Sequence, residues 1–415
     1  MSNAYAVLRI GDFRYFISSR FCVTLAIQIQ SVVVGYQIYE LTKNPFSVGL
    51  IGLAEAIPSI GVSLYAGHVA DIVIRKKIIM WCLAGLVFCS CALLYFTTDI
   101  SSFIQNFGTT PIYTVIFLSG IARGFLTPAN FSFMPQLVPK DMLQRAVTVN
   151  SSTWEVASIA GPAAGGFLYG LLGVTVAYAV DAGLTIVGLL LILNVASKPL
   201  PEESHEQGMI DKIKAGLRFV FTNKLVLGAM SLDLFAVLFG GAVAMLPFFA
   251  DEVLHVGAVG FGFLRAAPSI GALLVAFVLM HKPIKRNMGK ILLWCVAGFG
   301  VCTIFFAIST SFWLSLFLLM ATGGFDCVSV IIRITLLQTT TPENMKGRVS
   351  AVNNIFLGSS NEIGMFESGV AAKAMGVVPS VIFGGCMTIA VVGTISWLGK
   401  SLRRLQNVDE YANVN

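Results

Sequence analysis

The chain has 415 residues, of which 56% are hydrophobic and only 12% are charged, and its mean hydropathy is +0.83. A soluble domain carries about 25% charged residues because water must wet its surface, so this composition excludes an ordinary soluble protein. The apolar runs are about 20 residues long, which suits membrane-spanning helices and excludes a barrel of short alternating strands.

Twelve apolar runs, separated by polar segments, predict twelve membrane-spanning helices. In chain order they are residues 15–38, 46–70, 78–97, 112–135, 144–170, 172–195, 226–250, 258–280, 289–308, 312–337, 349–373 and 378–399. The first run is too long for the apolar core of a secretory signal and no small-residue cleavage site follows it, so we expect no cleavable signal peptide.

Lysine and arginine are distributed very unevenly across this topology. Of the 27, 21 lie on the side that carries both chain ends, and only Lys43 and Lys373 lie on the other. Four more fall within spans, namely Arg20, Arg123, Arg265 and Arg333. Positive residues favour the cytoplasmic side, so we expect both termini in the cytoplasm. The net charge of +6 follows from this topology, and we expect no nucleic-acid partner.

An internal repeat organises the chain. Residues 139–150 recur 203 positions later as residues 342–353, with Pro, Met, Arg, Val and Asn in register, and Pro58–Gly61 matches Pro268–Gly271. Such self-similarity indicates a duplication. We therefore predict an all-α membrane protein with two pseudo-symmetric six-helix bundles. The expected parts are an N-terminal bundle (1–195), a cytoplasmic linker with an amphipathic helix (196–224), a C-terminal bundle (225–400) and a cytoplasmic tail (401–415).

Three short motifs lie in or beside the predicted spans. The loop after the second span reads Gly67-His-Val-Ala-Asp71-Ile-Val-Ile-Arg75-Lys76-Lys77. The fourth span contains Arg123-Gly124, and the fifth contains Ala157-Ser-Ile-Ala-Gly161-Pro162-Ala-Ala-Gly165-Gly166.

These motifs resemble signatures of the major facilitator superfamily. The loop is similar to Gly-x-Leu-Ala-Asp-Arg-x-Gly-Arg-Arg, with Ile72 and Ile74 in place of its first Arg and second Gly. The resemblance implies a gating role for Gly67, Asp71, Arg75 and Lys76, and a role in proton coupling for Arg123. It also implies that Gly161, Pro162, Gly165 and Gly166 form an exporter motif.

Further segments resemble the enterobactin-exporter branch of that superfamily, namely residues 216–221, 262–268, 337–342 and 347–348. The resemblance implies the major facilitator fold and a location in the bacterial inner membrane. It also implies export of a siderophore-like or drug-like small molecule by alternating access, with proton antiport as the driving reaction. The expected partners are the substrate, protons and the lipid bilayer; we expect a monomer with no cofactor.

Polar side chains within the spans are candidates for the transport pathway, because a charge in the bilayer is costly and normally faces the protein interior. In the first span Arg20, Thr24, Gln28 and Ser31 recur at helical spacing and form one polar stripe. The candidates for lining a cavity are Arg20, Thr24, Gln28, Asp326, Arg333 and Asn361.

Buried acids are candidates for proton exchange, because burial favours the neutral form of an unpaired carboxyl group. Glu362 and Glu367 have no obvious cationic partner on their own helix. The candidates for coupling are Arg123, Glu155, Asp233, Glu362 and Glu367. Fixed interhelical ion pairs are the alternative for Asp181, Arg265, Asp326 and Arg333, and Glu155 has the alternative of pairing with Arg265.

Other classes of function find little support in the sequence. The four histidines are far apart in the sequence and no Cys-x-x-Cys pair occurs, so the sequence pattern indicates no metal site. A membrane-embedded enzyme or a channel would need a nucleophile, metal ligands or a ring of pore charges, and none is present in the sequence. We expect no enzyme activity. An uptake symporter or a facilitator on the same fold stays open as the alternative to an exporter.

Overall fold

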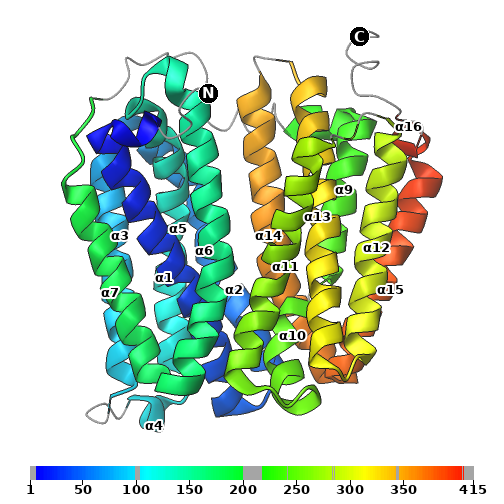
Figure 1. Cartoon of the computed structure of the whole chain (residues 1–415), viewed down its shortest axis with the longest axis horizontal. Coiled ribbons are helices and arrows are strands. Elements are labelled where there is room, and N and C mark those ends of the chain that lie inside the picture. The colour runs from blue at the N-terminus through cyan, green and yellow to red at the C-terminus, as the bar shows by residue number, and fades with distance from the viewer. Residues whose placement is uncertain are drawn as a thin grey trace. The chain divides into compact units, whose positions relative to one another are not determined.

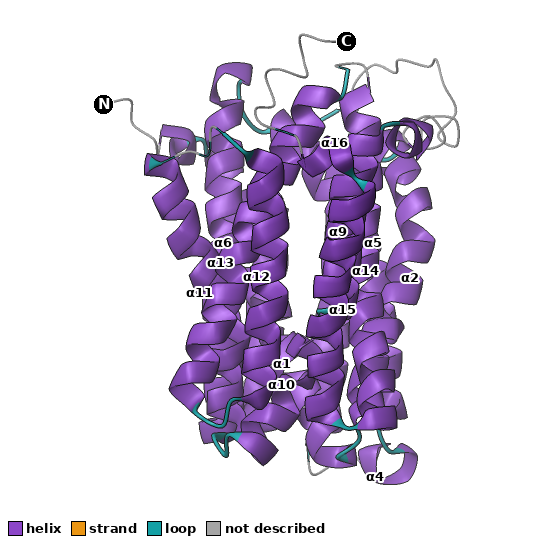
Figure 2. Ribbon diagram, turned by 90° about the vertical axis from the view of Figure 1, so that its right-hand side faces the viewer, coloured by secondary structure: helices purple, strands orange, loops and turns teal. Residues whose placement is uncertain are grey.

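A computed structural model describes residues 6–98, 103–199, 217–240, 242–282, 284, 286–342, 345–403 and 405. Throughout this part of the chain the regular elements are helices, and no strand occurs in it (Figure 2). Ten helical segments of the described residues are long and apolar enough to cross a membrane. The predicted all-α membrane fold is confirmed.

The helices of the first half follow the predicted spans closely (Figure 1). They are η1 (Ala6–Arg9), α1 (Gly11–Thr42), α2 (Pro45–Ile72), α3 (Arg75–Phe96), α4 (Phe103–Phe107), α5 (Thr110–Phe133), η2 (Met134–Gln136), η3 (Lys140–Met142), α6 (Leu143–Leu172) and α7 (Val174–Leu193).

The second half repeats this order. Its helices are α9 (Lys224–Phe239), α10 (Ala242–Phe248), the π-helical turn η4 (Phe249–Val253), α11 (Gly257–His281), α12 (Met288–Ile308), α13 (Phe312–Thr340), α14 (Lys346–Met375), α15 (Val377–Leu398) and α16 (Lys400–Arg403). The seventh predicted span, 226–250, is interrupted at Gly240, whose N–H closes the last turn of α9 on Ala236.

Two glycines end the fifth long helix of each half. Gly173, between α6 and α7, has φ +87°, and Gly376, between α14 and α15, has φ +93°. These backbone angles favour glycine, because a side chain would clash there. The two glycines lie 203 positions apart, the period of the sequence repeat. The repeat therefore sets the same helix boundary twice.

The predicted number of twelve spans stays a prediction. Helices α6 and α14 each have 30 residues but are not among the ten apolar segments. Both helices carry several polar residues, such as Asn150 and Glu155 on α6 and Asn353 and Glu362 on α14. Most of the predicted linker and tail, residues 200–216 and 406–415, lies outside the described residues, although residues 217–222 are helical.

The chain forms two compact units. The first comprises Met1–Lys43, Leu53–Ser204 and Val256–Ala266, and the second comprises Asn44–Gly52, His205–His255 and Ala267–Asn415. In the first unit α1 packs against α6 and α7, and α3 packs against α5 and α7. In the second unit α9 packs against α14 and α15, and α12 packs against α13 and α15. Helices related by the repeat thus pack in the same pairs, as two pseudo-symmetric bundles require.

Two short segments, Val256–Ala266 and Asn44–Gly52, belong to a different unit from the residues next to them in the sequence. Each contains a glycine in close contact with a helix of the unit to which it belongs. In the first unit, a Cβ atom on Gly166 of α6 would lie 2.6 Å from the Cα of Gly262 on α11. In the second unit, a Cβ atom on Gly49 of α2 would lie 2.8 Å from the Cα of Gly369 on α14. Small residues let helices approach this closely within a membrane. The predicted domain boundaries stay predictions.

Candidate functional site

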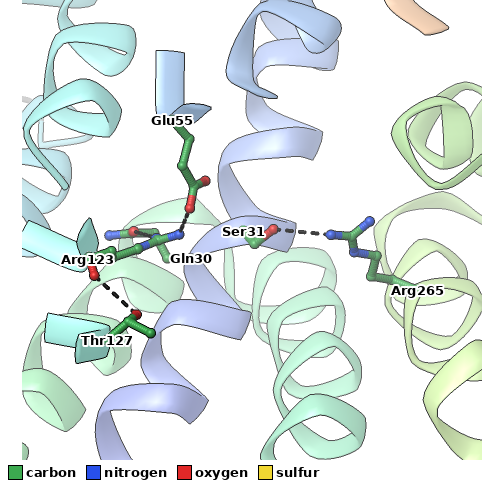
Figure 3. Close-up of polar contacts among 6 residues, drawn as sticks. All are labelled: Gln30, Ser31, Glu55, Arg123, Thr127 and Arg265. Carbon is green, nitrogen blue, oxygen red and sulfur yellow. Dashed lines mark hydrogen bonds and ion pairs between the residues drawn. The ribbon is translucent and has the colours of Figure 1, made fainter. Parts of the chain in front are cut away.

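A largely buried polar network joins helices of the first unit, and Figure 3 shows the part of it around Arg123. Arg123 on α5 forms an ion pair with Glu55 on α2 through its Nη1 atom. Its Nη2 atom donates a hydrogen bond of 3.1 Å to Oε1 of Gln30 on α1. The Nε2 atom of Gln30 donates in turn to Oδ2 of Asp181 on α7, over 3.2 Å. The network therefore links α1, α2, α5 and α7 through side chains alone.

Burial makes this network energetically important. Gln30 is 3% exposed and Asp181 is 1% exposed, and a buried polar group without a partner costs free energy. One helical turn from Asp181, Tyr178 donates to Oε1 of Gln37 over 2.6 Å. The contact between α1 and α7 is thus polar over two helical turns.

Sequence analysis missed Gln30, although a signal for it existed. Gln30 and Gln37 are seven residues apart, so they lie on one face of a helix. That face differs from the predicted stripe of Arg20, Thr24, Gln28 and Ser31. With 3.6 residues per turn, Gln30 is rotated about the helix axis by about a third of a turn from the stripe.

The predicted stripe on α1 faces α6 and α11 within the first unit. Gln28 donates through Nε2 to the hydroxyl oxygen of Ser158 on α6, over 3.1 Å. Arg265 on α11 donates through Nη2 to the hydroxyl oxygen of Ser31, over 3.5 Å (Figure 3). Thr24 and Arg20 lie one and two turns before Gln28 on α1, and both are partly buried. The stripe is therefore a continuous row of polar groups.

A second buried cluster lies in the second unit. Arg333 on α13 is 1% exposed and forms an ion pair with Asp233 on α9. Asp326 and Ser329 precede Arg333 by two helical turns and one turn. Together with Asp233 they border a small pocket with about 10 Å³ of space for water, close to the minimum for one molecule. The other lining residues are Ala236, Val237, Cys295, Val296, Phe299 and Phe325.

The candidate acids differ in their partners. Asp233 is paired with Arg333. Glu155 on α6 is partly buried and has no hydrogen bond or ion pair with any described residue, Arg265 included. Glu367 on α14 is partly buried and bonds to the hydroxyl of the adjacent Ser368. On the same helix, Glu362 is partly buried and Asn361 is exposed.

The predicted gating loop is described in part. Gly67 and the backbone of Asp71 belong to α2, and the side chain of Asp71 lies outside the described residues. Arg75 donates to the backbone carbonyl of Ser132 over 3.4 Å. Lys76 donates to the carbonyl of Leu193 over 2.9 Å. These two hydrogen bonds hold the start of α3 near the ends of α5 and α7.

The predicted exporter motif lies where α6 meets its neighbours in the first unit. Gly161, Pro162, Gly165 and Gly166 are all buried. A Cβ atom on Gly161 would lie 2.4 Å from the Cβ of Gln28 on α1. The motif therefore brings α6 close to the polar stripe.

Comparison with known proteins places the chain in one family. Residues 2–414 match the family described as transmembrane secretion effectors, a group of major facilitator transporters. The chain belongs to this family. The resemblance to the major facilitator superfamily inferred from the motifs is confirmed.

Curated relatives and solved structures resemble this transmembrane secretion effector over most of its length. The enterobactin exporters EntS of Escherichia coli O81 (strain ED1a) and Shigella dysenteriae serotype 1 (strain Sd197) are each 26% identical over 345 residues, covering 82% of this chain and 80% of each relative. The POT family transporter PepTSo gives a TM-score of 0.72 at 12% identity, covering 94% of this chain and 98% of that one. The nucleoside transporter NupG gives 0.70 at 13%, covering 93% and 99%. The transmembrane secretion effector is therefore a multi-pass membrane protein with a transporter fold.

Proposed function

We propose that this transmembrane secretion effector exports a small siderophore-like or drug-like molecule across the bacterial inner membrane by alternating access, in exchange for protons. The observation that carries the proposal is the similarity to enterobactin exporters over 82% of the chain. The two bundles with matching helix pairs support the mechanism, because repeated bundles move against each other around a site near the bilayer midplane.

Proton exchange is assigned to the buried acids. The candidates are Glu155, Asp233, Glu362 and Glu367. Asp233 forms an ion pair with Arg333, whereas the described contacts of Glu155 and Glu367 include no cation. A carboxyl group of the second kind is neutral while buried and ionises when its surroundings open to water. Arg123 adjusts the electrostatics of the first unit through Glu55 and Gln30.

Gating is assigned to Gly67, Asp71, Arg75 and Lys76. The hydrogen bonds from Arg75 and Lys76 to helix-end carbonyls support a role at one end of the first unit. A contact that forms in only one access state biases the equilibrium between the states. The loop would therefore set how long one side of the transporter stays closed.

We propose that the protein is a monomer. In the proposed orientation, both termini and the linker lie in the cytoplasm. The excess of lysine and arginine on one side supports it. A membrane-impermeant thiol reagent added to intact cells should label a cysteine introduced at Lys43 and leave one at Ser204 unmodified. The reverse pattern would require another topology.

The direction of transport distinguishes the exporter from its alternatives. In everted membrane vesicles that contain the full-length protein, respiration acidifies the lumen, which corresponds to the outside of the cell. An exporter driven by proton antiport accumulates enterobactin in the lumen, and a protonophore abolishes the accumulation. An uptake symporter would drive the compound out of the lumen, and a facilitator would equilibrate it without accumulation. Vesicles lacking the protein are the control.

A further inference from the structure

The four arginines within the spans fall into two pairs with different surroundings. Arg123 and Arg333 each form an ion pair with a carboxylate. Arg265 has only the 3.5 Å hydrogen bond to Ser31, and Arg20 has no hydrogen bond or ion pair within the described residues. Two intramembrane cations of the first unit therefore lack a bound counterion in the part of the chain that the structure describes.

Both of these cations lie along one polar seam, which is the contact of the polar stripe of α1 with helices α6 and α11. Arg20, Thr24, Gln28 and Ser31 follow one another at successive turns of α1, and all four are partly buried. The seam is joined to Ser158 of α6 by Gln28 and to Arg265 of α11 by Ser31. Figure 3 shows the Arg265 guanidinium directed at α1, with one nitrogen atom toward Ser31. The side of α1 that carries Phe16, Val23 and Ala26 is buried instead.

The nearby acids do not neutralise this seam. Glu55 exerts an electrostatic attraction on Arg265, but its carboxylate is bonded to Arg123. Glu155 lies on α6 one turn before Ser158 and bonds to neither arginine. Burying a cation without a counterion is costly, and intramembrane cations normally face a pathway for substrate or ions. Among the described residues, no carboxylate bonds to either of these two cations.

We infer that Arg265 binds the transported molecule through a negatively charged oxygen group, and that Arg20, three turns of α1 before Ser31, adds a second positive charge farther along the same row. The substrates are then organic anions such as carboxylates. A guanidinium has five N–H donors in a planar fork that fits a carboxylate with two parallel hydrogen bonds. Thr24 and Gln28 lie between the two arginines along the seam and offer neutral hydrogen-bonding groups to the rest of the molecule. This inference rests on the proposed transport function in treating the bound molecule as a substrate. The expected negative charge of that molecule rests on the geometry of the seam.

The test measures binding to the purified full-length protein, without transport. Benzoate and naphthoate are compared with benzamide and naphthamide, which have the same rings and no charge. The readout is the rise in unfolding temperature as each compound is titrated. We expect the carboxylates to bind more tightly than the amides. A hydrogen bond to a charged group contributes enough that Arg265→Gln should lower carboxylate affinity about ten- to a hundredfold and leave amide binding unchanged.

Further variants make the result decisive. Arg265→Lys keeps the charge and should retain a preference for carboxylates, and it replaces Arg265→Gln if the latter does not fold. Arg20→Gln should weaken the preference less than Arg265→Gln does, because Arg20 lies three turns of α1 away from Ser31 and acts only through its charge. Arg9→Gln removes the same charge from an exposed position and should change nothing. Equal binding of acids and amides, binding of neither, or an unchanged preference in both glutamine variants would overturn the inference. Failure of pH-driven export in vesicles with the carboxylate preference intact would overturn the proposed function alone.

Discussion

Arg123 on α5 forms an ion pair with Glu55 on α2, and the two residues are 68 positions apart in the chain. The side chains are 17% and 24% exposed, so both charges are largely removed from water. Removing one partner of a buried pair leaves an uncompensated charge, which costs about 3–5 kcal/mol. Removing both leaves no charge.

We therefore predict that Glu55→Gln and Arg123→Gln each lower the free energy of unfolding by about 3–5 kcal/mol. The double variant should lose less than the sum of the two single losses, because residues in contact are coupled. Denaturant unfolding of the purified protein in detergent measures all three values. Asp12→Asn, which breaks the more exposed pair with Lys198, should cost about 1 kcal/mol or less. Additive losses at Glu55 and Arg123 would show that the pair is not a structural unit.

Helix contact at the exporter motif gives a second prediction. Gly166→Ala should lower the free energy of unfolding by about 1–3 kcal/mol, because its Cβ atom would meet the backbone of Gly262 and force the helices apart. Gly183→Ala on α7 is the matched control, since nothing lies within 4 Å of the added atom. Thermal unfolding of the two variants compares them directly. Equal stabilities would mean that α6 and α11 do not approach as closely as described.

Helix boundaries followed from the sequence with small errors. Residues 289–308 were expected as a span, and α12 runs from Met288 to Ile308. Gly173 and Gly376 were not singled out in the sequence, although they are 203 positions apart and have similar backbone angles. The break of the seventh span at Gly240 could not be predicted. Glycine within an apolar run is tolerated in many helices, and only packing decides where one is interrupted.

The charged groups of the site were found from the sequence, but their partners were not. A charge stands out in an apolar run, so Arg123, Arg265 and Arg333 were readily identified. Arg333 has Asp326 two turns away on its own helix, yet it pairs with Asp233 of α9. Such choices depend on how helices distant in sequence rotate against one another, which hydropathy does not record. Gln30 was missed because the neutral residues selected on the first span were those in helical register with Arg20, and Gln30 lies on another face.

The gating loop gives a third prediction. Asp71→Asn should lower the transport rate while expression and substrate binding stay nearly unchanged, because we propose that the Asp71 charge acts on the equilibrium between access states. Transport by the purified variant in proteoliposomes and binding in detergent give the two readouts. Asp12→Asn is the control with the same chemical change. A normal turnover in Asp71→Asn would remove the gating role.

Proton coupling gives a fourth prediction. Glu155→Gln, Glu362→Gln or Glu367→Gln should abolish pH-driven transport while the unfolding temperature stays close to that of the unaltered protein. Substrate counterflow should survive in the same variant, because exchange of substrate for substrate needs no net proton movement. Asp233→Gln is expected to behave differently, since it leaves the Arg333 charge without its partner and destabilises the fold. If all four variants retained pH-driven transport, proton exchange through these acids would be wrong.

Proton movement coupled to substrate is the most direct test of the central claim. Proteoliposomes that contain the full-length protein and a trapped pH-sensitive dye are given an outward gradient of enterobactin, with the membrane potential clamped to zero. Antiport predicts that protons enter as the compound leaves, so the lumen acidifies, and that liposomes without the protein show no change. Alkalinisation of the lumen, or efflux of the compound with no proton movement, would contradict the account.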